Sequence, residues 1–326
     1  MRYFVGIDLG GTNIKAGIVR EDGKLLRKAN MKTAVNEGDI RIVQDMAELT
    51  KDVMREQSLS VSDITAVGIG TPGVPNTEKG LLVFANNIPF RNTPMRNIFQ
   101  EELNLPVFIE NDANCAAMAE CKAGAAKGTL HSVTVTIGTG LGSGVIINGQ
   151  IYSGFNQAGV EFGHTTIVKD GFPCSCGRRG CLETYASATG LIRMTNEMAE
   201  KHPDSKLHDL MRRDEKISAR HAFEAMKDGD PYAYELVQNY IEYISEGLAN
   251  LINTFMPEIL VIGGGVCHEG DTLLVPLIEK TMRKPLWGQG VKRTEIRLAE
   301  LGNDAGIIGA AMFGMISSGS GSVYGD

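Results

Sequence analysis

One structural design occurs twice along the chain and limits the fold more than any other feature. It consists of an apolar, β-branched strand, a glycine-rich turn and a second strand. The first copy is YFVGIDLGGTNIKAGIV at residues 3–19, and the second is SVTVTIGTGLGSGVII at residues 132–147. Each copy predicts two strands joined by a tight turn. The repeat is typical of a weak internal duplication, so the 326 residues are predicted to form two α/β domains rather than one large core.

Strand-like and helical patterns alternate along the rest of the chain, which indicates the α/β class. Residues 39–57 carry apolar side chains at the i, i+3, i+4 spacing of an amphipathic helix. The remaining strands are predicted at 64–70, 106–112, 259–266 and 296–301, and the remaining helices at 113–124, over most of 185–256 and at 305–315. The low-complexity tail at 318–326 is expected to be disordered.

The charge distribution excludes two classes of partner. The formal net charge is −7 and Lys and Arg form no long run, so we expect neither nucleic acid nor an anionic membrane as a partner. Asp8 interrupts the first apolar run, which is therefore a strand rather than a signal peptide. Since no stretch is long enough to span a bilayer, we expect a soluble, cytoplasmic protein.

Three glycine-rich turns follow predicted strands, at 10–13, 138–142 and 263–265. Glycine lets the backbone approach a phosphate and direct several N–H groups at it. One such turn is common without any ligand, but three at strand ends favour phosphate binding. The P-loop signature G-x-x-x-x-G-K-[ST] is absent, and the G-x-G-x-x-G match at 68–73 is followed by Pro75 where a dinucleotide site needs a helix.

Three of the six cysteines fall within eight residues, at 174–181. In a cytosolic chain this spacing indicates a metal site rather than disulfides. Unliganded free thiols are the alternative interpretation.

Three sequence motifs together resemble the ROK family of bacterial sugar kinases and repressors. They are Asp8-Leu-Gly-Gly-Thr-Asn13, Glu110-Asn-Asp-Ala-Asn114, and Glu161-Phe-Gly-His164 followed by Cys174-Ser-Cys-Gly-Arg-Arg-Gly-Cys181-Leu-Glu183. The resemblance covers residues 1 to about 314 and is strongest to the glucokinases of that family. It implies a two-domain actin/hexokinase-like (ribonuclease H-like) fold with the active site in the cleft between the domains.

The resemblance also implies the domain boundaries. The small α/β domain would comprise residues 1–115 together with the C-terminal helix at about 305–317. The large α/β domain would comprise residues 116–304 and include a zinc-binding loop at 164–183. A homo-oligomer, dimer or tetramer, is expected.

The implied reaction is transfer of a phosphoryl group from ATP to the C6 hydroxyl of glucose, with catalytic Mg²⁺. Asp112 would be the general base; a helix N-cap is the alternative interpretation for an Asp between a strand and a helix. Asp8 would orient Mg²⁺ and the phosphates, with turn capping as its alternative. The nucleotide would be bound by Asp8, Gly10, Gly11, Thr12, Asn13, Gly138, Thr139, Gly140, Gly142, Gly263, Gly264 and Gly265.

The sugar would be bound mainly by carboxylates and amides, which can exchange several hydrogen bonds with hydroxyl groups. The residues implied are Gly73, Asn87, Asn111, Asp112, Glu161, His164 and Glu183.

A structural Zn²⁺ would be held by His164, Cys174, Cys176 and Cys181. One nitrogen and three sulfurs make a closed tetrahedral set, which leaves no position for water or substrate. Loss of the metal is expected to weaken sugar binding and to leave the distant nucleotide-binding turns little changed.

Other activities remain open on sequence grounds. Another ROK kinase could act on N-acetylglucosamine, N-acetylmannosamine, allose or fructose. A ROK repressor would carry a helix-turn-helix module, for which no room is expected ahead of the strand that starts at Tyr3. A catalytically inactive sugar-binding regulator is disfavoured because Asp8 and Asp112 are both present.

Overall fold

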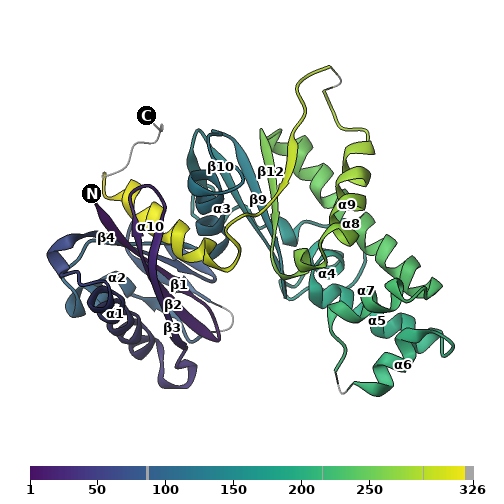
Figure 1. Ribbon diagram of the computed structural model, residues 1–326, viewed down its shortest axis with the longest axis horizontal. Helices are drawn as coiled ribbons and strands as arrows, with labels where there is room; N and C mark the ends of the chain where they lie inside the picture. Colours follow the sequence, from purple (N-terminus) through teal and green to yellow (C-terminus); the bar gives the residue numbers. More distant parts are fainter. Residues whose placement is uncertain (86–87, 215, 289, 320–326) are drawn as a thin grey trace. The chain divides into compact units, whose positions relative to one another are not determined.

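The computed structural model describes residues 1–85, 88–214, 216–288 and 290–319 (Figure 1). The predicted disorder of the tail therefore falls, for residues 320–326, outside the described residues.

The chain divides into two compact units. The first comprises Met1–Thr134, Gly144–Val160 and Ala299–Asp326, and the second comprises Val135–Ser143 and Glu161–Leu298.

The first five-stranded sheet has the order β3-β2-β1-β4-β8. Its strands are β1 (Tyr3–Leu9), β2 (Asn13–Arg20), β3 (Leu25–Lys32), β4 (Ile64–Thr71) and β8 (Val107–Asn111). β1 and β2 are antiparallel, as predicted, whereas β4 and β8 run parallel to β1. The carboxyl ends of β1, β4 and β8 therefore meet at one edge of the sheet. β3 was not predicted; its partly exposed sequence LLRKANMK lacks the apolar content of the other strands.

Helices cover both faces of this sheet because its side chains alternate in direction. Val5, Ile7 and Leu9 pack in a core cluster with α1 (Asp39–Glu56). Phe4 packs in a second cluster with α10 (Ala305–Ser317), so the two helices lie on opposite faces.

Two glycines bring α10 unusually close to the sheet. A Cβ at Gly6 would lie 1.8 Å from the carbonyl oxygen of Ile307, and one at Gly68 would lie 1.7 Å from that of Ala310. Gly68 in the G-x-G-x-x-G match thus serves helix packing. Strand β5 (Val74–Asn76) follows this match, where a dinucleotide site would require a helix.

A small three-stranded sheet with the order β5-β6-β7 was also not predicted. Besides β5, this sheet contains β6 (Leu81–Phe84) and β7 (Arg91–Thr93). The chain then continues through α2 (Met95–Glu102), β8 and α3 (Asp112–Ala123). These strands of three or four residues are too short to produce a recognisable alternation of apolar and polar side chains.

The second five-stranded sheet has the order β11-β10-β9-β12-β13. Its strands are β9 (Ser132–Ile137), β10 (Leu141–Ile147), β11 (Gln150–Tyr152), β12 (Ile259–Gly263) and β13 (Glu295–Leu298). The predicted strand, glycine turn and strand at 132–147 correspond to β9 and β10. The predicted α/β class is confirmed, and the structure contains two five-stranded sheets.

The predicted helical segment at 185–256 is also confirmed. Its helices are α4 (Glu183–Ala186), α5 (Ala188–Lys201), α6 (Lys206–Arg213), α7 (Ala219–Lys227) and α8 (Pro231–Phe255), and α9 (Asp271–Arg283) follows β12. Asp230 begins α8 by accepting a hydrogen bond of 2.8 Å from the Ala233 N–H, with Pro231 at the first helical position.

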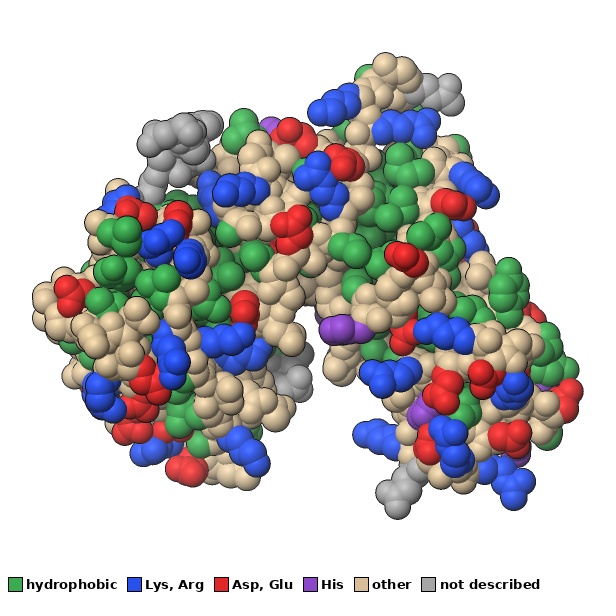
Figure 2. All heavy atoms as spheres, in the orientation of Figure 1, with side chains coloured by type: hydrophobic (Ala, Val, Ile, Leu, Met, Phe, Trp, Pro, Cys, Tyr) green, Lys and Arg blue, Asp and Glu red, His purple; other side chains and the backbone are tan. Residues whose placement is uncertain are grey.

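Acidic and basic side chains are interspersed over the face drawn in Figure 2. Within the described part of the chain, no helix is both long enough and apolar enough to cross a membrane.

Candidate active site and metal centre

Asp112 and Asp8 lie at the carboxyl edge of the first sheet, at the ends of β8 and β1. Asn111 caps α3, because its Oδ1 accepts hydrogen bonds from the N–H groups of Ala113 (2.9 Å) and Asn114 (3.2 Å). The interpretation of Asp112 as the N-cap is therefore wrong, although Asp112 Oδ1 also accepts a hydrogen bond of 2.8 Å from the Ala113 N–H. Asp112 is the first residue of the helix, where a carboxylate is stabilised by the helix dipole.

Three carboxylates lie near enough to the fully buried thiol of Cys115 to act on it electrostatically. Burial raises the pKa of this thiol well above its usual value, and the negative charges of Glu110, Asp112 and Asp8 raise it further. The fold thus brings Asp8 and Asp112, which are far apart in sequence, to the same neighbourhood.

Glu110, a buried residue of β8, binds residues on either side of Asp112. Its side chain is only 4% exposed, and burial raises its pKa, while hydrogen bonds from Asn114 Nδ2 (3.0 Å) and the Asn111 N–H (2.8 Å) act in the opposite direction. These bonds hold the segment that carries Asp112.

Lys15 is a site neighbour that the sequence reasoning missed. Its Nζ lies 2.9 Å from Asp8 Oδ2, and the two residues are directly opposite in the β1–β2 register. The sequence could have indicated this pairing, because Asp8 and Lys15 are equally distant from the centre of the predicted turn and therefore face each other across the two strands. Gly306 at the start of α10 also packs on Asp8, because a Cβ there would lie 2.7 Å from the Asp8 Cγ.

Two of the predicted sugar contacts of the first unit touch each other. Gly73 has a φ of +86°, and a Cβ would lie 2.0 Å from the carbonyl oxygen of Phe84, so the backbone itself requires glycine here. The Gly73 carbonyl oxygen accepts a hydrogen bond of 3.2 Å from Asn111 Nδ2. Asn87 lies outside the described residues.

The second unit brings its two glycine turns together. Gly264 has a φ of +97°, and a Cβ there would lie 2.4 Å from the carbonyl oxygen of Ile137, the residue before the 138–142 turn. A pocket of about 530 Å³ is lined by Gly138 and Thr139 from one turn and by Gly265 from the other. This volume is typical of small-molecule sites.

The wall of this pocket includes side chains that were not predicted, among them Arg220, Phe223 and His268. They come from α7, its N-terminal flank and the 3₁₀ turn Gly265–Glu269, and no motif in the sequence distinguishes them.

Glu183 contacts the 138–142 turn directly. Its Oε2 accepts a hydrogen bond of 2.9 Å from the Leu141 N–H, and a Cβ at Gly140 would lie 2.5 Å from the same oxygen. Burial raises the pKa of Glu161, the charge of His164 lowers it, and the charge of Glu183 raises it. Glu161, His164 and Glu183, all predicted sugar contacts, are therefore near enough to interact electrostatically. The expectation that the 138–142 turn lies far from the cysteine loop is wrong. Glu183 bonds to this turn and is only two residues beyond Cys181.

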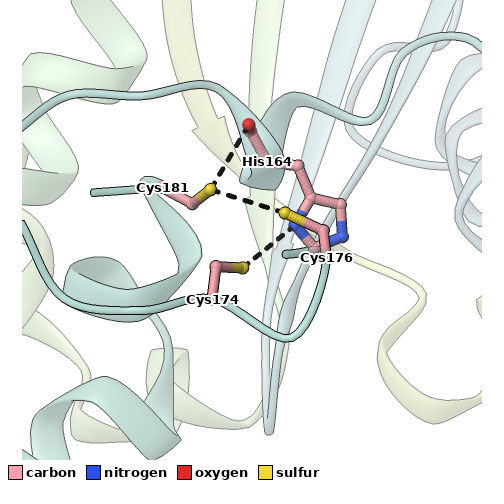
Figure 3. A group of neighbouring side chains, drawn as sticks. All are labelled: His164, Cys174, Cys176 and Cys181. Atoms are coloured by element: carbon pink, nitrogen blue, oxygen red, sulfur yellow. Dashed lines mark hydrogen bonds between the residues drawn. The ribbon is translucent and has the colours of Figure 1, made fainter. Parts of the chain in front are cut away.

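The four predicted zinc ligands converge. The potential ligand atoms of His164, Cys174, Cys176 and Cys181 all lie within 4.8 Å of one another, and Figure 3 shows the three thiols and the imidazole turned toward a common centre. The Sγ atoms of Cys176 and Cys181 are 3.7 Å apart. Zn–S bonds of ~2.3 Å in a tetrahedral site separate sulfurs by about 3.8 Å, so the donor set fits zinc.

Comparison with known proteins adds to this geometry. The ROK family model matches residues 4–315. A glucokinase of Halalkalibacterium halodurans is 37% identical over 311 residues, which are 94% of this chain and 93% of the relative.

Solved structures match over the same extent. The ROK family glucokinase from Streptomyces griseus, in complex with glucose and AMPPNP, is 33% identical, with a TM-score of 0.80 over 96% of this chain and 99% of that one. The ROK hexokinase from Thermus thermophilus is 35% identical, with a TM-score of 0.82 over 98% and 100%. These likenesses confirm the predicted actin/hexokinase-like fold, and the chain belongs to the ROK family.

Proposed function

We propose that this protein is an ATP-dependent glucokinase that converts glucose to glucose 6-phosphate. The observation that carries the proposal is the position of Asp112. It begins α3 at the carboxyl edge of the first sheet, where Asp8 also lies. The N-cap of this helix is Asn111, so N-capping does not account for an Asp at position 112. The similarity to glucokinases over nearly the whole chain supports the choice of sugar.

In the proposed reaction Asp112 accepts the proton of the C6 hydroxyl as that oxygen attacks the γ-phosphorus. The bond from the γ-phosphorus to the bridging oxygen breaks, and ADP leaves with the bond's electron pair. A positioned base of this kind is worth ~10²–10⁴-fold in rate. The N-terminal end of α3 favours the ionised carboxylate that this role requires.

Backbone N–H groups would bind the phosphates at residues 10–13 and 138–142, and the pocket beside Gly265 would hold the adenosine. Bound Mg²⁺ would neutralise charge on the transferring phosphoryl group. Asp8 offers a carboxylate for it, and Lys15 sits close enough to add a positive charge at the same place.

Sugar hydroxyls would be bound by Gly73, Asn87, Asn111, Glu161, His164 and Glu183. The amide of Asn111 uses its oxygen for the cap and one proton for Gly73, so its second proton is the group available to a hydroxyl. His164 turns Nδ1 toward the thiols, at 3.5 Å from Cys174 Sγ, so its Nε2 is the nitrogen available to sugar.

A structural Zn²⁺ bound by His164, Cys174, Cys176 and Cys181 would order the loop that carries Glu161 and Glu183. We also propose a cytoplasmic location, because ATP is an intracellular substrate. We further propose a dimeric or tetrameric assembly, which light scattering would measure.

A coupled assay of ADP release tests the function. We expect kcat/KM for glucose to exceed that for N-acetylglucosamine, N-acetylmannosamine, allose and fructose. A tenfold preference for one of these sugars would make the protein a different ROK kinase. Glucose binding without turnover would indicate a sugar-binding regulator.

A further inference from the structure

The first glycine turn is held by a threonine from the segment that follows β3. Thr33 Oγ1 donates a hydrogen bond of 2.7 Å to the carbonyl oxygen of Gly10, and the Thr33 N–H donates one of 2.9 Å to that of Thr12. One residue thus binds two carbonyl groups of a single turn.

The second glycine turn is held in the same way. Thr189 Oγ1 donates a hydrogen bond of 2.7 Å to the carbonyl oxygen of Thr139, and the N–H of the adjacent Ala188 donates one of 2.9 Å to that of Gly138. In both turns, one threonine hydroxyl and one backbone N–H bind two carbonyl oxygens.

This arrangement determines which backbone groups face a ligand. A carbonyl oxygen carries partial negative charge and repels phosphate, whereas an N–H group attracts it. With these carbonyls bonded elsewhere, the N–H groups of Gly11, Thr12, Thr139 and Gly140 donate to no acceptor within the part of the chain that the structure describes. Two successive N–H groups in each turn are therefore available to an anion.

We propose that Thr33 and Thr189 are positioning residues for the nucleotide phosphates, each fixing one turn with its carbonyls directed away from the ligand. The inference rests on the proposed function, since it assigns the phosphates to these turns. The side chain of Thr189 is exposed and that of Thr33 is only partly buried, so neither is needed to fill a core.

The test is the affinity for AMPPNP and, separately, for glucose, measured by isothermal titration calorimetry. Thr33→Val and Thr189→Val keep the shape of the side chain and remove the hydroxyl. Each is expected to weaken AMPPNP binding by about 3- to 10-fold, the range of one hydrogen bond, with the glucose affinity unchanged. Thr33→Ser and Thr189→Ser retain the hydroxyl and are expected to restore AMPPNP binding.

Each unit offers a matched control. Thr129 Oγ1 donates to the carbonyl oxygen of Ala126 at 2.7 Å, and Thr254 Oγ1 donates to that of Asn250 at 2.7 Å, both away from the glycine turns. Thr129→Val and Thr254→Val should bind AMPPNP like the unmodified protein.

AMPPNP binding by Thr33→Val and Thr189→Val that equals that of these controls would overturn the inference while leaving the kinase proposal intact. Unmodified protein that neither binds AMPPNP nor phosphorylates glucose would overturn both. If a valine variant does not fold, Thr33→Ala and Thr189→Ala remove the same hydroxyl and must show the same loss.

Discussion

Across the junction of β8 and α3, Asn114 Nδ2 donates a hydrogen bond of 3.0 Å to the buried carboxylate of Glu110, four residues earlier in the chain. Glu110 also accepts the N–H of Asn111, so the residue before Asp112 is held to the same carboxylate. The segment that carries the proposed base is therefore anchored on a buried ionisable group.

Burial of Glu110 predicts a pH dependence of stability. Its pKa is raised above the ordinary value of 4.5, so above that pH the folded protein retains a proton that the unfolded chain releases. The free energy of unfolding contributed by Glu110 is then complete below 4.5 and falls as the pH rises through the folded-state pKa.

Glu110→Gln removes this titration and keeps an oxygen that can accept both hydrogen bonds. We expect the variant to gain stability relative to the unmodified protein as the pH rises above 4.5, measured by urea unfolding. Glu101→Gln, at an exposed position of α2, is the control and should show no such gain. Equal shifts in the two variants would argue against a raised pKa at Glu110.

Asp112→Asn tests the general base. The variant should keep its glucose affinity and lose at least about 100-fold in kcat, because the amide cannot accept the C6 proton. Asp39 is the matched control, since it also begins a helix and its Oδ1 also accepts the N–H of the next residue, at 2.9 Å against 2.8 Å for Asp112. Asp39→Asn with a similar loss in kcat, or Asp112→Asn with near-normal turnover, would contradict the assignment.

Glu183 and Glu161 are expected to differ in their effect on the nucleotide. Both are proposed to bind sugar, but only Glu183 also accepts the Leu141 N–H of the 138–142 turn. Glu183→Gln should therefore weaken both glucose and AMPPNP binding several-fold, because its carboxamide has a single acceptor oxygen. Glu161→Gln should weaken glucose alone, and calorimetry with each ligand separates the two patterns.

Cys176→Ala should remove the zinc, measured by elemental analysis, because three ligands remain of a closed set of four. We expect severely weakened glucose binding and also weakened AMPPNP binding, since the loop carries Glu183 to the turn. Cys121→Ala deletes a thiol in α3 and should retain the metal. A zinc-free Cys176→Ala protein with normal affinity for both ligands would show that the metal does not organise this loop.

Local patterns in the sequence by themselves determined one helix, two glycine turns and the candidate metal site of this protein. The amphipathic spacing at 39–57 predicted α1, and the glycine turns at 10–13 and 138–142 were placed between the correct strands. The cysteine spacing at 174–181 predicted a metal site, because residues so near in sequence can converge within one loop. Periodicity, turn chemistry and short ligand spacing act over a few residues, so the sequence alone reveals them.

Tertiary structure alone decided which distant groups meet. The Leu141 N–H and Glu183 are 42 residues apart, and Thr139 and Thr189 are 50 residues apart, yet each pair forms a hydrogen bond. Likewise, only the backbone angles at the β8–α3 junction made Asn111 the cap rather than Asp112. These outcomes depend on how strands and helices pack after they form, and packing is a property of the whole folded chain that no local pattern records.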